Sequence, residues 1–348
     1  MKRALRHCAF VAVAAMSTLA IGLAAPPAHA QDDAEFYKGR QISWILSTGE
    51  GGGYTTAANA FLPYFTKHIP GNPRIIVQTM PGAGGLRAMQ YLSTQAAKDG
   101  SVIGLVHSGV PLAPLFGLKG ANFDGRTFGW IGSLNDTVAL CVAWSAAGIR
   151  TVKDLYEKEF VVGGTGAGSQ METYPQLLAR LLGMRVKIIS GYKSGNEVYI
   201  AMERGEVAGR CGGGFTSINT TRPEWLPSGK AVVPLIFGFK RTRELPDVPV
   251  VMELAKDERT RQILALVMAP QQMDRPLLLP PGAPAARLAQ LRKAFDAAMN
   301  DPAFIEDAAR QRIEMAHVGG ERLEAIIAEA YKAPPEVVTA AREAMGGM

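Results

Sequence analysis

Short apolar runs alternate along the chain with longer amphipathic stretches, and glycine clusters stand at several of the junctions. In the first third of the chain, this pattern predicts three strands and two helices in alternation. The strands are predicted near 41–47, 74–79 and 101–107, and the helices near 55–68 and 86–97. Such alternation is typical of a mostly parallel sheet, whose ligand-facing loops leave the carboxyl ends of the strands.

The same pattern restarts in the middle of the chain, which predicts a second lobe of similar construction. Its predicted strands lie near 159–163, 185–190, 206–211 and 231–239, and its helices near 170–182 and 195–204. The last part is predicted to hold a strand near 263–269 and helices near 284–299, 302–312 and 320–331. We expect the tail, near 334–345, to cover the first lobe. The predicted fold class is α/β with two lobes, each a mostly parallel sheet flanked by helices.

The N-terminus has the pattern of a secretory signal peptide. A basic start leads into an apolar run over 8–25, and Ala28-His29-Ala30 fits the small-x-small cleavage rule. An uncleaved membrane anchor is the alternative, but no second apolar span follows. We therefore expect residues 1–30 to be removed near Ala30 and the mature chain to be exported.

Charge and motif content argue against several classes of function. The formal net charge is +6, and the mature chain is nearer +3 because three of the 37 basic residues precede the cleavage site and 31 residues are acidic. A charge this small does not indicate nucleic-acid binding. The mature chain has three histidines, none in a metal-binding pattern, and it lacks both the G-x-S-x-G elbow and the phosphate-binding P-loop. We expect no metal and no catalytic residues.

A glycine-rich run and two cysteines also bear on cofactor binding and on disulfide formation. The glycine-rich run 164–168 resembles a dinucleotide fingerprint, but no acidic residue ends the next predicted strand at 188–190. We therefore expect no cofactor. Cys141 and Cys211 remain after cleavage, and their spacing allows either a disulfide in an oxidising compartment or two buried thiols.

The triple glycine Gly51-Gly52-Gly53 ends one predicted strand and opens one predicted helix. Glycines allow a tight turn and a close approach of the backbone to a ligand. A helix start also leaves unpaired N–H groups, which favour a bound anion. A second turn of this kind, over 164–169, opens the helix predicted near 170–182. Together the two turns predict a carboxylate held between two lobes.

Five motifs, taken in order, resemble those of the periplasmic solute-binding proteins of tripartite tricarboxylate transporters, the Bug or TctC family. They are Phe36-Tyr37-Lys38-Gly39-Arg40-Gln41-Ile42 with Gly51-Gly52-Gly53, Pro81-Gly82-Ala83-Gly84-Gly85 with Lys98-Asp99-Gly100, Thr165-Gly166-Ala167-Gly168-Ser169, Gly191-Tyr192-Lys193-Ser194-Gly195, and Leu245-Pro246-Asp247-Val248-Pro249. Each motif is short, but the ordered set covers nearly all of the mature chain.

The resemblance implies a type II periplasmic binding fold, in which two lobes joined by crossing strands close on a ligand. Lobe 1 would comprise 31–137 and 262–348, and lobe 2 would comprise 138–261. The resemblance further implies a monomeric periplasmic protein, not an enzyme, that captures a small organic carboxylate for the large and small subunits of a membrane permease. The small net charge separately predicts no nucleic-acid partner.

The chain departs from the family pattern near the expected site. Gly49-Glu50 replaces prolines before the triple glycine, Tyr54-Thr55 replaces a Thr-Asp pair, and Gly212 stands where an acid is common. With these acids absent, a ligand that carries a free ammonium group is less expected. The identity of the ligand therefore does not carry over from the family.

The candidate ligand-binding residues belong to the glycine turns and to the loops that should lie beside them. They are Gly51, Gly52, Gly53, Tyr54, Thr55, Thr56, Gly84, Gly85, Ser108, Thr165, Gly168, Ser169, Gln170 and Tyr192. Some have a structural alternative: the first turn as a plain tight turn capped by Thr55, Ser169 as an N-cap, Gly84 and Gly85 as close-packing positions, and Tyr192 as a core or surface residue. His107 is a minor candidate.

Two questions stay open at the level of sequence. Arg210 either attracts a second carboxylate of the ligand or forms a surface ion pair. The chain itself either serves a permease, presents its ligand to a membrane sensor, or is an exported enzyme that uses the same cleft.

Overall fold

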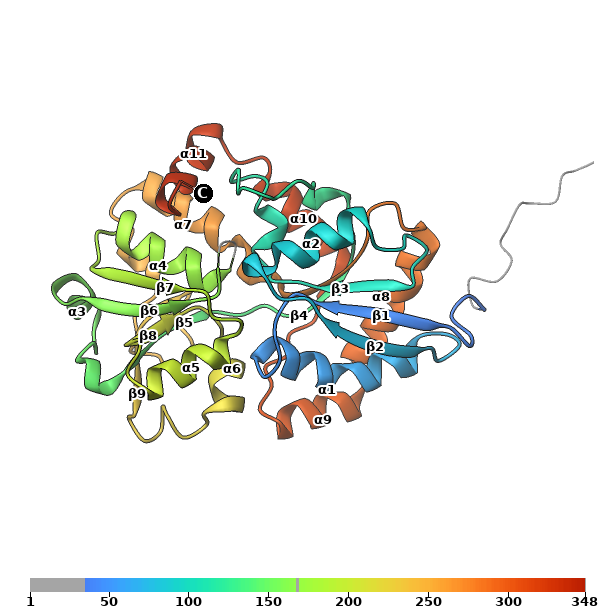
Figure 1. Cartoon of the computed structure of the whole chain (residues 1–348), viewed down its shortest axis with the longest axis horizontal. Coiled ribbons are helices and arrows are strands. Elements are labelled where there is room, and N and C mark those ends of the chain that lie inside the picture. The colour runs from blue at the N-terminus through green and yellow to red at the C-terminus, as the bar shows by residue number, and fades with distance from the viewer. Residues whose placement is uncertain (1–34, 167–168, 348) are drawn as a thin grey trace, which may run out of the picture. The chain divides into compact units, whose positions relative to one another are not determined.

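Two β-sheets, each covered by helices on both faces, organise the chain (Figure 1). The computed structural model describes residues 35–166 and 169–347, and these belong to one compact unit. The signal peptide predicted over 1–30 and its cleavage near Ala30 lie outside the described residues. We refer to the elements around the first sheet as lobe 1 and to those around the second sheet as lobe 2.

The first sheet has the strand order β11-β4-β10-β3-β1-β2. Its strands are β1 (Gln41–Leu46), β2 (Arg74–Thr79), β3 (Val102–Leu105), β4 (Gly129–Asn135), β10 (Asp274–Leu279) and β11 (Val318–Gly319). Strand β1 is parallel to β2 and β3, whereas β10 is antiparallel to β3 and β4. Strands β1 to β4 therefore share one direction, as the sequence predicts for a mostly parallel sheet.

The second sheet has the strand order β7-β6-β8-β5-β9. Its strands are β5 (Ala139–Trp144), β6 (Phe160–Gly164), β7 (Val186–Ser190), β8 (Gly209–Cys211) and β9 (Ala231–Phe237). Strand β6 is parallel to β7 and β8, and β5 is antiparallel to β8 and β9. The two-lobe α/β fold predicted from the sequence is thus confirmed. The predicted lobe boundaries, 31–137 with 262–348 and 138–261, stay a prediction.

The chain crosses twice from one sheet to the other. The strand that follows each crossing runs antiparallel to the strands on both sides of it. After β4, residues 136–138 lead into β5; the return passage enters the first sheet at β10. Cys141 of β5 and Cys211 of β8 are register partners and form a disulfide, which resolves the alternative that the sequence left open.

Apolar helix faces cover both sides of each sheet. In lobe 1, α1, α8 and α9 share one core with Trp44 and Leu277, whereas α2 and α10 cover the other face. In lobe 2, α5 and α6 pack on one face, and α3 and α4 pack on the other. The helices are α1 (Gly53–His68), α2 (Leu86–Thr94), α3 (Val152–Glu157), α4 (Gln170–Arg180), α5 (Gly195–Glu203), α6 (Phe215–Thr221), α7 (Glu258–Met268), α8 (Ala285–Met299), α9 (Pro302–Arg310), α10 (Gly320–Ala330) and α11 (Pro335–Ala344).

Two expectations for the C-terminal third are wrong. The apolar run near 263–269 was predicted to be a strand, but it lies in α7, which begins where the Asp257 side chain accepts a hydrogen bond from the Thr260 N–H at 2.7 Å. A short apolar run fits a buried helix as well as a strand, and here the cap and the packing against α11 decide the outcome. The tail does not simply cover lobe 1, because α11 packs against α7 and α4.

The length and apolarity of the helices show whether any of them could span a membrane. Over the described ranges 35–166 and 169–347, no helix is both long and apolar enough to cross a bilayer.

Candidate functional site

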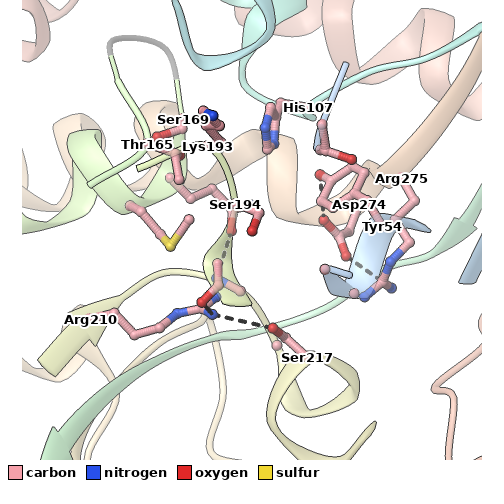
Figure 2. Close-up of a pocket in the computed structure, with 18 residues that line it drawn as sticks. Tyr54, His107, Thr165, Ser169, Lys193, Ser194, Arg210, Ser217, Asp274 and Arg275 are labelled. Atoms are coloured by element: carbon pink, nitrogen blue, oxygen red, sulfur yellow. Dashed lines mark hydrogen bonds and ion pairs between the residues drawn. The ribbon is translucent and has the colours of Figure 1, made fainter. Parts of the chain in front are cut away.

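One pocket takes its lining from both lobes (Figure 2). The volume open to the centre of a water molecule is about 60 Å³, which suits a small solute. The lining residues are Thr48, Gly52, Gly53, Tyr54, His107, Thr165, Ser169, Gln170, Met171, Lys193, Ser194, Gly195, Arg210, Gly213, Gly214, Ser217, Asp274 and Arg275.

The start of α1 forms part of the lobe 1 wall. Its N-cap, Gly52, has no side chain to cap the helix, so N–H groups of the first turn are left for another acceptor. Gly52 is buried, yet a Cβ atom built on it would meet nothing within 4 Å. The missing side chain therefore points into the pocket, as a close approach of backbone to ligand requires.

The start of α4 forms the corresponding part of the lobe 2 wall. Its N-cap, Ser169, is 1% exposed, and its hydroxyl makes no hydrogen bond with any described residue. The Thr165 hydroxyl, on the loop before it, is buried and equally without a partner in the described part of the chain. Buried hydroxyls cost free energy unless they are hydrogen-bonded, so these two are suited to a bound acceptor.

Two more helices begin at the pocket. Ser194 is the N-cap of α5, and its Oγ accepts a hydrogen bond from the Glu197 N–H at 3.3 Å. Gly214 is the N-cap of α6, and Ser217 lies in the first turn of that helix. Four helix N-termini thus meet at one cavity, and each contributes partial positive charge.

A hydrogen-bonded network of the half-buried Tyr54 with buried side chains completes the lobe 1 wall. The Tyr54 hydroxyl donates to Asp274 Oδ1 at 2.9 Å and accepts from the Ser108 N–H at 3.3 Å. Arg275 Nη1 lies 3.1 Å from Asp274 Oδ2 and donates to Asn135 Oδ1 at 2.7 Å. Burial, and then the Asp274 carboxylate, raise the pKa of Tyr54 well above its ordinary value, so this phenol remains a hydrogen-bond donor.

Arg275 occupies an unusual backbone conformation for its type. Its φ is 59°, in the left-handed region, and it is 2% exposed within β10. A non-glycine residue held there costs on the order of 1 kcal/mol, and such residues cluster at functional sites. Asp274 and Arg275 open the strand that returns from lobe 2, so the network lies where the chain passes between the lobes.

The structure excludes one of the two roles considered for Arg210. This residue does not form a surface ion pair: it is 3% exposed, lines the pocket, and has no carboxylate within ion-pair distance among the residues described. The surface ion pair considered from the sequence is wrong because β8 lies between β5 and β6 and is buried along its whole length.

His107, at the end of β3, lines the pocket and lies against Tyr54, with 4.9 Å between ring centroids. Burial lowers the pKa of His107 to about 4, so the ring is neutral at pH 7. Its contact with Tyr54 makes it part of the wall rather than a charged ligand group.

Burial of the His107 ring makes the free energy of unfolding depend on pH. The unfolded chain binds a proton at His107 near pH 6.5, whereas the folded chain does so only near pH 4. Neutral His107 therefore contributes its full share to the free energy of unfolding above pH 6.5. This contribution, about 3 kcal/mol, is lost as the pH falls from 6.5 to 4. We expect urea titrations of His107→Gln to show a smaller loss over this window than the wild type. Gln95→Ala, which changes an exposed side chain without a titratable group, is the control and should retain the wild-type dependence of the unfolding free energy on pH. If the free energy of unfolding falls equally with pH in the wild type and in His107→Gln, the lowered pKa of His107 is contradicted.

Of the fourteen ligand-binding candidates, six line the pocket, and so do His107 and Arg210; the six are Gly52, Gly53, Tyr54, Thr165, Ser169 and Gln170. Gly168 lies outside the described residues. The others, Gly51, Thr55, Thr56, Gly84, Gly85, Ser108 and Tyr192, are not among the lining residues. That any of them binds a ligand stays a prediction.

The residues outside the lining have structural contacts instead. The Thr55 hydroxyl donates to the Gly49 carbonyl at 3.0 Å, and the Thr56 hydroxyl donates to the Gly52 carbonyl at 3.2 Å. A Cβ at Gly85 would lie 3.1 Å from the His107 ring, so this glycine permits close packing. Ser108 supports the lining residues, since its Oγ accepts from Gln170 Nε2 at 3.1 Å and thereby joins the two lobes.

Several lining residues were missed at the level of sequence. They are Thr48, Met171, Lys193, Ser194, Gly195, Gly213, Gly214, Ser217, Asp274 and Arg275. The motif at 191–195 did single out part of this set, and its helix-start pattern was the available signal. Asp274 and Arg275 follow no glycine turn, so nothing in their local sequence indicates that they reach the pocket.

The fold and pocket define a two-lobed α/β protein of the binding-protein class, with the site between the lobes. The chain belongs to the tripartite tricarboxylate transporter receptor family, whose model matches residues 67–341. A relative from Cupriavidus necator, described as a UPF0065 protein in the gbd 5' region, is 26% identical and is matched over 96% of each chain.

Solved structures show the same fold. The periplasmic binding protein BugD has a TM-score of 0.71 at 20% identity, over 88% of this chain and 98% of its own. MatC from Rhodopseudomonas palustris, solved with bound malate, has a TM-score of 0.65 at 19% identity, over 88% and 99%. A further R. palustris protein, solved with adipate, has a TM-score of 0.65 at 15% identity, over 87% and 97%. The predicted family is therefore confirmed.

Proposed function

We propose that this protein is a periplasmic solute-binding protein that captures a small organic carboxylate in the pocket. The observation that carries the proposal is the meeting of four helix N-termini at one cavity that also holds the unpartnered, buried Ser169 hydroxyl. Helix N-termini and free hydroxyl donors stabilise a carboxylate by charge-assisted hydrogen bonds. Malate and adipate, the ligands of two proteins with this fold, are both carboxylates.

The charge of the lining supports an anionic ligand. Three cationic side chains, Lys193, Arg210 and Arg275, face one carboxylate, Asp274, which leaves two units of formal positive charge. Arg210 and Arg275 are buried, whereas Lys193 is exposed. Excess positive charge at such a site favours the binding of an anion.

We further propose that the ligand draws the two lobes together. Lobe 1 offers the start of α1 and lobe 2 offers the start of α4, so a ligand contacts both walls fully only when they are close. That difference in contact is what shifts the equilibrium toward the closed state. The loaded protein, a monomer, then delivers its ligand to the large and small subunits of a tripartite-type permease rather than transforming it.

Thermal unfolding tests the ligand class directly. We expect at least one acid from a panel of mono-, di- and tricarboxylates, aromatic acids and amino acids to stabilise the mature protein. At about 100 times its dissociation constant, that acid should add about 2.7 kcal/mol to the free energy of unfolding. Sugars and metal cations serve as the negative controls. Stabilisation by a sugar or a cation, with every acid inert, would refute the proposed function.

A further inference from the structure

Arg210 is embedded in the floor of the pocket by hydrogen bonds that leave its charge unopposed. Its Nε and Nη2 donate to the Gly212 carbonyl at 3.1 and 2.6 Å, and its Nη1 donates to the Gly195 carbonyl at 3.1 Å. Nη1 also donates to Ser217 Oγ at 3.3 Å. Every one of these acceptors is neutral. A guanidinium has five N–H groups, so one on Nη2 remains for another acceptor.

A buried cation without an anion is costly to the folded chain. The Arg210 side chain is 3% exposed, and within the described residues its charge meets only dipoles and the Tyr199 ring, 4.5 Å from ring centroid to Cζ. A cation–π contact recovers less free energy than the burial of an ion costs. The residual cost is relieved when an anion binds at this guanidinium.

Glycines around Arg210 keep space for the guanidinium. A Cβ atom at Gly195 would lie 2.5 Å from Nη1, and one at Gly213 would lie 2.2 Å from Nη2. Any larger residue at either position would displace the guanidinium from the pocket wall. These two glycines thus leave the room that an arginine side chain needs at this place.

The other buried arginine of the pocket is already neutralised. Arg275 is paired with the Asp274 carboxylate at 3.1 Å, and Asp274 also accepts from Tyr54. Figure 2 shows Arg210 beside Ser217, on the opposite side of the pocket from Tyr54 and Asp274. The unopposed charge therefore lies on the lobe 2 side, apart from the network at the start of α1.

We infer that Arg210 binds a second acidic group of the ligand and so determines specificity for diacids over monocarboxylic acids and zwitterionic amino acids. The inference rests on the proposed function, because it assumes that a first carboxylate is held at the helix starts. A diacid matches the two units of excess positive charge in the lining, whereas a monoacid leaves Arg210 desolvated and unpaired.

Matched pairs of linear acids test this inference by calorimetry. The probes are butyrate against succinate and hexanoate against adipate, each measured at the same ionic strength. A desolvated, charge-assisted hydrogen bond should make the wild-type protein bind at least one diacid about tenfold to a hundredfold more tightly than its monoacid partner. Arg210→Gln should lose most of that ratio by weakening diacid binding, with little change for the monoacid.

Arg222 provides the matched control. It is also an arginine of lobe 2 near an aromatic ring, but it pairs with Glu203 at 2.7 Å and does not line the pocket. Arg222→Gln should retain the wild-type ratio of diacid to monoacid affinity. Circular dichroism and the melting temperature of each ligand-free variant verify that it folds.

The outcomes separate the inference from the function on which it rests. If no acid binds the wild-type protein, the proposed function fails and the inference fails with it. If a monoacid binds as tightly as its diacid partner, or if folded Arg210→Gln keeps the full ratio, the function stands and the inference is overturned. If Arg210→Gln does not fold, the test uses the wild type and the variant Gly195→Ala, which displaces Nη1 of Arg210. Equal affinity of the wild type for monoacid and diacid overturns the inference. An unchanged ratio of diacid to monoacid affinity in Gly195→Ala overturns it as well.

Discussion

Replacing Gly52 by leucine is expected to abolish ligand binding while the protein remains folded. The backbone at Gly52 has φ −99° and ψ 168°, which any residue adopts. A Cβ atom there meets nothing within 4 Å, so the leucine side chain would extend into the cavity without displacing a neighbour. Because the lining contains the start of α1, the same side chain would cover the N–H groups that are expected to hold the carboxylate.

The measurement combines calorimetry with urea unfolding. We expect heat of binding to vanish for the acid identified with the wild type, and the free energy of unfolding to change by less than about 0.5 kcal/mol, as for substitutions that disturb no packed contact. Gly319→Leu is the control, because a Cβ at Gly319 also meets nothing within 4 Å but lies at the start of α10, away from the pocket lining. Full affinity in Gly52→Leu would remove the start of α1 from the binding site.

The parts of the fold that could be predicted from sequence are those whose signals are local. Alternating apolar runs and glycine turns placed β1, β2 and β3 with the helices between them, because strand pairing and helix starts leave marks within a few residues. Strand β10 was missed because it is buried along its whole length and shows no alternation of apolar and polar residues. The end of α7 was predicted as a strand because its buried apolar run is too short to show a helical period. The position of α11 on lobe 2 depends on the path of the chain after α10, which no local pattern records.

The same distinction applies to the site. Gly52, Gly53, Ser169 and Gln170 were predicted because a glycine turn that opens a helix is a recognisable anion-binding arrangement, and all four line the pocket. Arg210 gave no comparable signal. Its burial follows from the central place of β8 in its sheet, and its role in the lining follows from glycines that are distant in sequence, such as Gly195. Tertiary contacts of this kind determine a binding site as much as its motifs do.

The largest loss of stability is expected from Asp274→Asn. Asp274 is 3% exposed and supplies the carboxylate that lies 3.1 Å from Arg275. The substitution keeps the shape of the side chain but leaves the Arg275 charge buried, with Asn135 as its remaining hydrogen-bond partner. Removing one partner of a buried ion pair costs about 3–5 kcal/mol, because the other charge stays desolvated and uncompensated. Urea unfolding of the ligand-free protein measures this difference.

Glu203→Gln tests whether burial is the cause of that loss. Glu203 and Arg222 are also paired, at 2.7 Å, but the Glu203 side chain is 39% exposed and the Arg222 side chain 19%. Solvent screens a pair of this kind, so its loss should cost no more than about 1 kcal/mol. A comparable cost for the two substitutions would mean that water or a neighbouring acid such as Glu314 compensates Arg275 when Asp274 is neutral.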